Sequence, residues 1–250
     1  MIKLNIDFKT IIINIIKSSS VLKKKYFVKH PNTKYSIFFI LDELLYVLKT
    51  GLSWRNTRSP IHWNSLYYHF NILTKYNIFK KLFYKLRKKI KKNNIYVIDS
   101  SFVQNKNGKN YIKRNKFYKN KNGNKISLIT DLNGTPLSIF TNTANKHDLS
   151  FIEKHFNDIT IKNSIMLADK GYVSEKIRNE YKINFMIPKK KNQKKVYYFD
   201  KQLYKKRIIV ENTFQKIKSF RRINQRYDSK ISSFNSFLYF ACSIIIHKNI

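Results

Sequence analysis

The chain has 250 residues, with 51 Lys and Arg against 14 Asp and Glu and hence a formal net charge of +37. Because 42% of the residues are hydrophobic and 15% are aromatic, the chain can bury a sizeable core, which excludes a disordered basic tail. The charge excludes a cationic partner and favours nucleic acid or an anionic membrane surface. The longest apolar runs, 11–16 and 237–246, are shorter than the roughly 20 residues that cross a bilayer, so we expect neither a membrane span nor a signal peptide. The single cysteine, Cys242, excludes a disulfide framework within the chain.

Residues 1–92 are predicted to be mostly helical. The first clear helix is expected to end at the Thr-Gly pair 50–51, since glycine commonly closes a helix. The Ser-Pro pair 59–60 predicts the start of the next helix. A third, with an apolar face and interspersed lysines, is expected over residues 78–90. The arrangement is compatible with a helix-turn-helix-like DNA-binding domain, and equally with a solvated basic face. Residues 1–34 are interpreted as a basic extension.

From residue 93 the pattern changes to short apolar runs typical of strands, with helices between them. An Asn-Gly pair at 133–134 separates two such runs and is a strong hairpin signal. Asp148 has the position of a helix N-cap. The order of elements predicts a mixed sheet with flanking helices over residues 93–250. The expected strands cover residues 95–98, 125–130, 136–141, 164–167 and 184–187, and the expected helices about 148–156, 174–181, 204–220 and 234 onward.

Two of the few acidic residues follow predicted strands. Asp99 and Asp169 each end a buried-looking run, which is where α/β sheets often present functional groups. An ordinary turn or cap carboxylate is the alternative for either residue alone. Asp131 lies in the predicted hairpin, where aspartate is common turn chemistry.

Four polar residues form one stripe on the predicted helix over residues 204–220. Tyr204, Arg207, Glu211 and Lys218 fall within about 60° of one another at 100° per residue. The stripe borders an apolar face, so the helix can pack on the sheet and keep the stripe at the margin. The alternative is a surface Arg207–Glu211 pair, which stabilises a helix by a few tenths of a kcal/mol.

These segments together resemble the DDE transposases of bacterial insertion sequences, in the insertion-sequence-four/five superfamily. The four-residue stripe matches their Y-x2-R-x3-E-x6-K signature without a departure. The resemblance runs from about residue 35 to the end. It also rests on Asp99 after a strand, the Ala-Asp-Lys-Gly-Tyr segment 168–172, the Thr-Gly-x2-Trp-Arg segment 50–55, Lys146-His147-Asp148 and Ile187-Pro188.

The resemblance implies a ribonuclease-H-like catalytic domain over residues 93–250, preceded by a small helical domain over residues 1–92. It assigns a metal-binding catalytic triad that would hold two Mg²⁺ ions, or Mn²⁺ in their place, for phosphodiester cleavage. It also assigns three residues that would hold the transposon end, and it leaves His147 as a structural residue or a contact behind the site. The implied triad is Asp99, Asp169 and Glu211, and the implied DNA-binding residues are Tyr204, Arg207 and Lys218.

The function implied is that of a transposase, which cleaves the ends of its mobile element and joins the 3′-OH to target DNA. The expected partners are double-stranded DNA, as terminal inverted repeats and target, and a second copy in a homodimeric synaptic complex, with no membrane. The expected location is the bacterial cytoplasm at the nucleoid, or the nucleus or host-cell cytoplasm for a eukaryotic or viral genome. Two alternatives remain: a catalytically silent DNA-binding protein derived from a transposase, and a metal-dependent nuclease without strand transfer.

Overall fold

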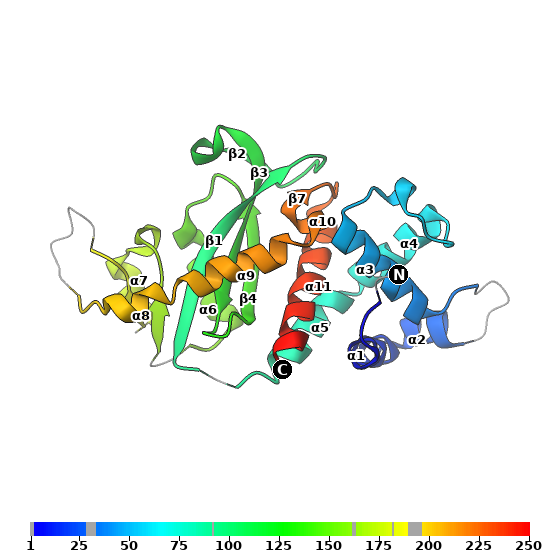
Figure 1. Cartoon of the computed structure of the whole chain (residues 1–250), viewed down its shortest axis with the longest axis horizontal. Coiled ribbons are helices and arrows are strands. Elements are labelled where there is room, and N and C mark those ends of the chain that lie inside the picture. The colour runs from blue at the N-terminus through cyan, green and yellow to red at the C-terminus, as the bar shows by residue number, and fades with distance from the viewer. Residues whose placement is uncertain (1–2, 29–33, 92, 162–163, 182, 190–196) are drawn as a thin grey trace.

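The computed structural model describes residues 3–28, 34–91, 93–161, 164–181, 183–189 and 197–250. A mixed sheet with covering helices forms one half of the molecule, and a group of N-terminal helices forms the other (Figure 1). The C-terminal helix α11 (Ile231–Asn249) lies between the two and contacts both. The prediction of a mixed α/β fold with flanking helices is confirmed. Within the described ranges, no helix combines the length and the apolar character that crossing a membrane requires.

The N-terminal helices bury a continuous apolar face. The expectation of a basic extension before residue 35 is wrong, since Phe8, Ile12 and Ile16 recur at helical spacing and are fully buried. Gly51 closes a helix at φ 69°, as predicted. The helix start predicted at Ser59 is three residues early, because the Ser59 hydroxyl accepts a turn hydrogen bond from the N–H of Ile61. The elements are α1 (Ile6–Lys17), α2 (Ser20–Phe27), α3 (Ile37–Thr50), the 3₁₀ turn η1 (Trp54–Asn56), α4 (Trp63–Lys75) and α5 (Ile78–Arg87).

The sheet combines parallel and antiparallel strands in the order β2-β3-β1-β5-β6, with β4 added beside β3 and β7 beside β1. The predicted hairpin is confirmed, with Gly134 at φ 72° in its turn. The strand predicted to end at Asp99 instead continues to Asn105, because its second half pairs with β3. The strands are β1 (Ile95–Asn105), β2 (Lys113–Asn115), β3 (Lys121–Thr130), β4 (Pro136–Thr143), β5 (Ile165–Leu167), β6 (Asn184–Met186) and β7 (Gln225–Arg226).

The helix predicted over residues 204–220 is interrupted. The N–H groups of Arg207, Ile209 and Val210 donate to carbonyls three residues back, which tightens the chain and separates two helices. Most of the basic loop at 189–195 lies outside the described residues. The other helices are η2 (Lys116–Tyr118), η3 (Asp148–Phe151), α6 (Ile152–Asp158), η4 (Lys170–Tyr172), α7 (Glu175–Tyr181), α8 (Lys201–Lys205), α9 (Ile208–Lys218) and α10 (Arg221–Asn224).

Two apolar clusters cover the two faces of the sheet. Val97 and Val103 of β1 face the larger cluster, which includes α9, α11 and the N-terminal helices. Tyr96 and Ile98 face the smaller cluster, which includes α6. This alternation is the two-residue period of a strand that is buried on both sides. Cys242 is fully buried in α11, within the larger cluster.

A buried hydrogen-bond chain links α5, α6 and the sheet. Arg87 donates to Asp158 at 2.7 Å, and the Ser138 hydroxyl donates to the same carboxylate at 2.7 Å. Since the hydroxyl hydrogen of Ser138 is used, its oxygen accepts from Nδ1–H of His155 at 2.8 Å. Nε2 of His155 lies 2.9 Å from the Ser127 hydroxyl. Because full burial disfavours the charged imidazole, the network holds His155 in its neutral form.

The neutral state of His155 predicts a loss of stability in acid. Burial lowers the pKa of His155 from 6.5 to about 3. Between pH 6.5 and about pH 3, His155 is protonated in the unfolded chain and neutral in the folded chain. The free energy of unfolding therefore falls as the pH drops below 6.5, by up to about 1.4 kcal/mol per pH unit. We expect urea denaturation of His155→Gln to show a shallower decline between pH 7 and pH 5 than the wild type. Equal slopes would contradict this assignment.

Candidate active site

Parallel pairing of β1 with β5 brings Asp99 and Asp169 to the same edge of the sheet. The register pairs Val97 with Leu167; Asp99 follows two residues later within β1, and Asp169 lies two residues past the end of β5. The Asp169 carboxylate accepts from the N–H of Gly171 at 2.7 Å, which holds it at the start of η4. The parallel pairing therefore brings together two acids that are 70 positions apart in the sequence.

Arg207 joins Asp99 to Glu211. One guanidinium nitrogen of Arg207 donates to Asp99 at 2.8 Å, and the other donates to Glu211 in the first turn of α9. The Asp99 side chain is 19% exposed and that of Glu211 is 40% exposed. The interpretation of Arg207 and Glu211 as a mere surface pair is therefore wrong, because the same guanidinium also binds a mostly buried carboxylate on the sheet.

The environment of Asp99 disfavours its negative charge. Burial, together with the charges of Asp169 and Asp148, raises the pKa of Asp99 from 3.8 to about 6. The N–H of Ser100 and the Arg207 guanidinium oppose this rise. A buried carboxylate beside two others is a site where an added cation is stabilised.

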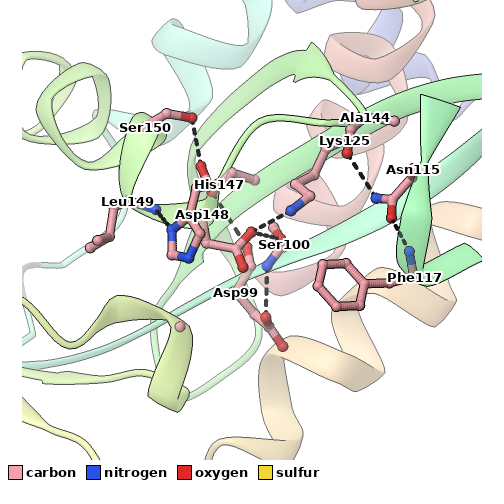
Figure 2. Close-up of polar contacts among 12 residues, drawn as sticks. Asp99, Ser100, Asn115, Phe117, Lys125, Ala144, His147, Asp148, Leu149 and Ser150 are labelled. Carbon is pink, nitrogen blue, oxygen red and sulfur yellow. Dashed lines mark hydrogen bonds and ion pairs between the residues drawn. The ribbon is translucent and has the colours of Figure 1, made fainter. Parts of the chain in front are cut away.

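Asp148 belongs to this cluster, which the sequence interpretation missed. Its carboxylate accepts from the Ser100 hydroxyl and, at 2.9 Å, from Nζ of Lys125 (Figure 2). The prediction of Asp148 as a helix cap is wrong, because Nδ1 of His147 takes that role and accepts from the N–H of Leu149. The sequence feature that could have indicated this role is the position of the His147-Asp148 pair between Asp99 and Asp169.

The absence of a side chain at residue 171 keeps the cluster compact. A Cβ added to Gly171 would stand 2.8 Å from an oxygen of Asp169 and 3.2 Å from an oxygen of Asp148. These carboxylates therefore line the same small space. A side chain at this position would push them apart.

Lys218 and Tyr204 lie on either side of the carboxylate cluster. Nζ of Lys218 donates to the Ser101 hydroxyl at 2.7 Å and to the Phe102 carbonyl at 2.9 Å, further along β1 from Asp99. Burial lowers the pKa of this lysine. The Tyr204 ring packs against Phe199, with centroids 5.1 Å apart. The stripe expected on one helix is thus distributed over the end of α8, the break and α9.

The cluster offers the oxygen ligands that Mg²⁺ prefers, and one or two carboxylates per ion suffice. Asp99 and Asp169, at adjacent strands, fit such an ion. Across the part of the chain that the structure describes, however, no three His, Cys, Asp or Glu side chains are close enough to hold one metal ion together. Glu211 is held by Arg207 instead, so its place in a metal site stays a prediction.

The contact between Asp148 and Lys125 predicts energetic coupling. Both side chains are mostly buried, at 22% and 14% exposed. Removing Asp148 takes away the carboxylate that pairs with Lys125, and removing Lys125 leaves the Asp148 carboxylate with the Ser100 hydroxyl but without its cation. We expect Asp148→Asn and Lys125→Met each to lower the free energy of unfolding by roughly 1–3 kcal/mol. The double variant should lose less than the sum of the two, as measured by urea denaturation. Strictly additive losses would show that the pair does not interact.

Comparisons with known proteins agree with this geometry. A family model described as the transposase DDE domain matches residues 90–246, well over half of the chain. A Burkholderia cepacia protein, named as a transposase for insertion sequence element IS402, is 27% identical over 136 residues, which cover 49% of this chain and 62% of that protein.

One solved structure shares the fold. It is the cryo-EM structure of the piggyBac transposase synaptic complex with hairpin DNA, at a TM-score of 0.54 and 9% identity. The match covers 97% of this chain and 65% of the piggyBac chain. This chain therefore spans just under two thirds of the length of each relative. The family match, which runs from before β1 through α9, places this chain in the transposase DDE domain family.

Proposed function

We propose that this chain cleaves the ends of its own mobile element and joins the freed 3′-OH to target DNA. The observation that carries the proposal is the meeting of Asp99 and Asp169 on parallel strands, with Glu211 tied to Asp99 through Arg207. Arg207 and Lys125 contact this cluster and Lys218 lies further along β1, in a chain of charge +37, and such cations attract DNA phosphates. Family membership supports this chemistry for the cluster.

The proposed site uses Asp99, Asp169 and Glu211 to hold two Mg²⁺ ions, with Mn²⁺ as a substitute. When bound, the metal would supply a deprotonated nucleophile and stabilise the leaving oxygen. Arg207 would exchange its carboxylate partners for a phosphate, which a guanidinium can bind bidentately. Lys218 would add a point charge further along the DNA strand, and Tyr204 would flank the bound end.

The same proposal extends to the rest of the molecule. Residues 93–250 would form a ribonuclease-H-like catalytic domain, and residues 1–92 a helical DNA-binding domain. The substrates would be double-stranded terminal inverted repeats and target DNA. Two copies would pair two ends in a synaptic complex. The protein would act wherever its element resides: at the nucleoid in a bacterium, or in the nucleus or host-cell cytoplasm for a eukaryotic or viral genome.

Replacing Asp99 tests the catalytic proposal. Labelled DNA with the inverted repeats that flank the coding region is incubated with Mg²⁺ and the purified protein. We expect Asp99→Asn to reduce cleavage by at least about 10³-fold, since it removes several kcal/mol of transition-state stabilisation. DNA binding should persist, because basic residues supply it.

Glu153→Gln is the matched control, since Glu153 is an exposed acid on α6 outside the cluster. It should cleave like the wild type. Cleavage by Asp99→Asn at the wild-type rate would reject the site. Wild-type protein that binds DNA but never cleaves it would favour the silent DNA-binding alternative, and cleavage without joined products would favour the nuclease alternative.

Metal binding provides a test that does not depend on activity. We expect Asp169→Asn to weaken Mn²⁺ binding by about tenfold or more, measured by electron paramagnetic resonance on DNA-free protein. Glu153→Gln again serves as the control and should bind Mn²⁺ like the wild type. Equal Mn²⁺ affinities for wild type and Asp169→Asn would remove this residue from the proposed metal site.

A further inference from the structure

The loop between β2 and β3 exposes aromatic side chains to solvent. Phe117 in η2 is 95% exposed, and the neighbouring Tyr118 is 48% exposed. Lys119 and Asn120 complete the loop at φ 51° and 54°, in the left-handed region that is common for asparagine and uncommon for lysine. A single exposed apolar side chain is ordinary, so the inference rests on what lies beside Phe117.

Contacts at its base fix this loop in place. Asn115 donates from its side chain to the buried Ala144 carbonyl at 2.7 Å and accepts from the N–H of Phe117 at 2.9 Å (Figure 2). Tyr118 stacks on Phe102 of β1, with centroids 4.5 Å apart and an interplanar angle of 17°. Gly123 leaves the space that the Phe102 ring occupies, since an added Cβ would meet that ring at 2.4 Å. The loop therefore presents Phe117 with little conformational freedom to lose on binding.

An open cavity of about 430 Å³ adjoins the loop, here called the loop cavity. Its lining combines aromatic faces, cations and amide groups. The aromatic faces can stack on a planar ring, the cations can bind phosphate, and the amides can hydrogen-bond the edge of a base. The lining residues used in this argument are Phe102, Phe117, Tyr118, Lys119, Lys121 and Lys218, with amides from Gln104, Asn224 and Gln225.

The loop cavity lies along β1 from the carboxylate cluster. Phe102 is three residues beyond Asp99, about 10 Å along the strand, so its side chain leaves the opposite face of β1 and the route between the two sites passes over the edge of that strand. β1 has β3 on one side. On its other side it pairs with β5 up to Val97 and with β7 from Gln104, and among the described strands none pairs with it between these two residues. Lys218 donates to a β1 carbonyl within this interval and also lines the cavity. A nucleic-acid strand with a phosphate at the carboxylates can thus extend into the loop cavity.

We propose that the loop cavity binds one unpaired nucleotide of the DNA strand held at the carboxylate cluster, with its base stacked on Phe117 and its phosphate beside Lys119, Lys121 and Lys218. Only an unpaired base presents both a free face and a free edge, so the cavity distinguishes a frayed or overhanging end from a continuous duplex. The inference rests on the proposed function, since it assumes that DNA lies at the cluster. It adds a discrimination between paired and unpaired ends.

The test compares two DNA probes by fluorescence anisotropy in EDTA, so that binding is measured without cleavage. One probe is a blunt duplex, and the other has the same duplex with a three-nucleotide overhang. Stacking on an aromatic side chain contributes about 1–3 kcal/mol per base, so we expect the wild type to bind the overhang roughly 5- to 150-fold more tightly. Phe117→Ala should lose this preference and keep its affinity for the blunt probe. 2-Aminopurine in the overhang should be quenched by the wild type and not by Phe117→Ala.

Two variants serve as controls. Phe117→Trp should retain the preference, because it keeps an aromatic face. Tyr198→Ala removes another exposed aromatic side chain, 77% exposed and outside the cavity lining, and should bind both probes like the wild type. An unchanged preference in Phe117→Ala, or an equal loss on both probes, would overturn the inference. Cleavage of inverted repeats by the same preparation tests the proposed function separately.

Discussion

The electrostatic repulsion among Asp99, Asp148 and Asp169 is the constraint around which this part of the molecule is organised. Parallel pairing of β1 with β5 brings two of these carboxylates together, and the turn before α6 adds the third. Burial and like charge destabilise the ionised form of Asp99, so each excess negative charge requires a positioned cation. Arg207 offsets Asp99, and Lys125 offsets Asp148. In a chain with few acids, such crowding supports the proposed site.

The interruption between α8 and α9 follows from the same requirement. It places Arg207 one turn before Glu211, so one guanidinium reaches both the sheet and the helix. Glu211 then lies in the first turn of α9, where the helix dipole favours a carboxylate. Lys218, two turns further, reaches β1 beyond the cluster. The helix α9 thus lies across the sheet and contacts β1 and β3 (Figure 1).

The helical half of the molecule is not an appendage to this sheet. α11 packs against α5 and against β4. The larger core cluster combines buried residues of α1–α5 with buried residues of α9, α10 and α11. The hydrogen-bond network of Arg87, Asp158, Ser138 and His155 adds a polar connection. It reaches β3, the strand beside Asp99, through the contact of His155 with Ser127. The backbone that positions the carboxylates is therefore stabilised from both ends of the sequence. The loop that carries Phe117 is anchored to the same strands and shares their rigidity.

Local patterns in the sequence determined the mixed α/β class, the hairpin at Gly134 and the helix end at Gly51. They also placed Asp99 and Asp169 directly after apolar runs. These features depend only on turn chemistry and on the period of apolar residues. The tertiary structure alone decided that β1 continues past Asp99, since that depends on pairing with β3. It also decided that Arg207 bridges two acids, because Asp99 is 108 positions away from it in the sequence. Asp148 shows the reason most clearly. Its sequence position resembles a helix cap, and only the folding of β1 and β3 beside it provides Ser100 and Lys125 as partners.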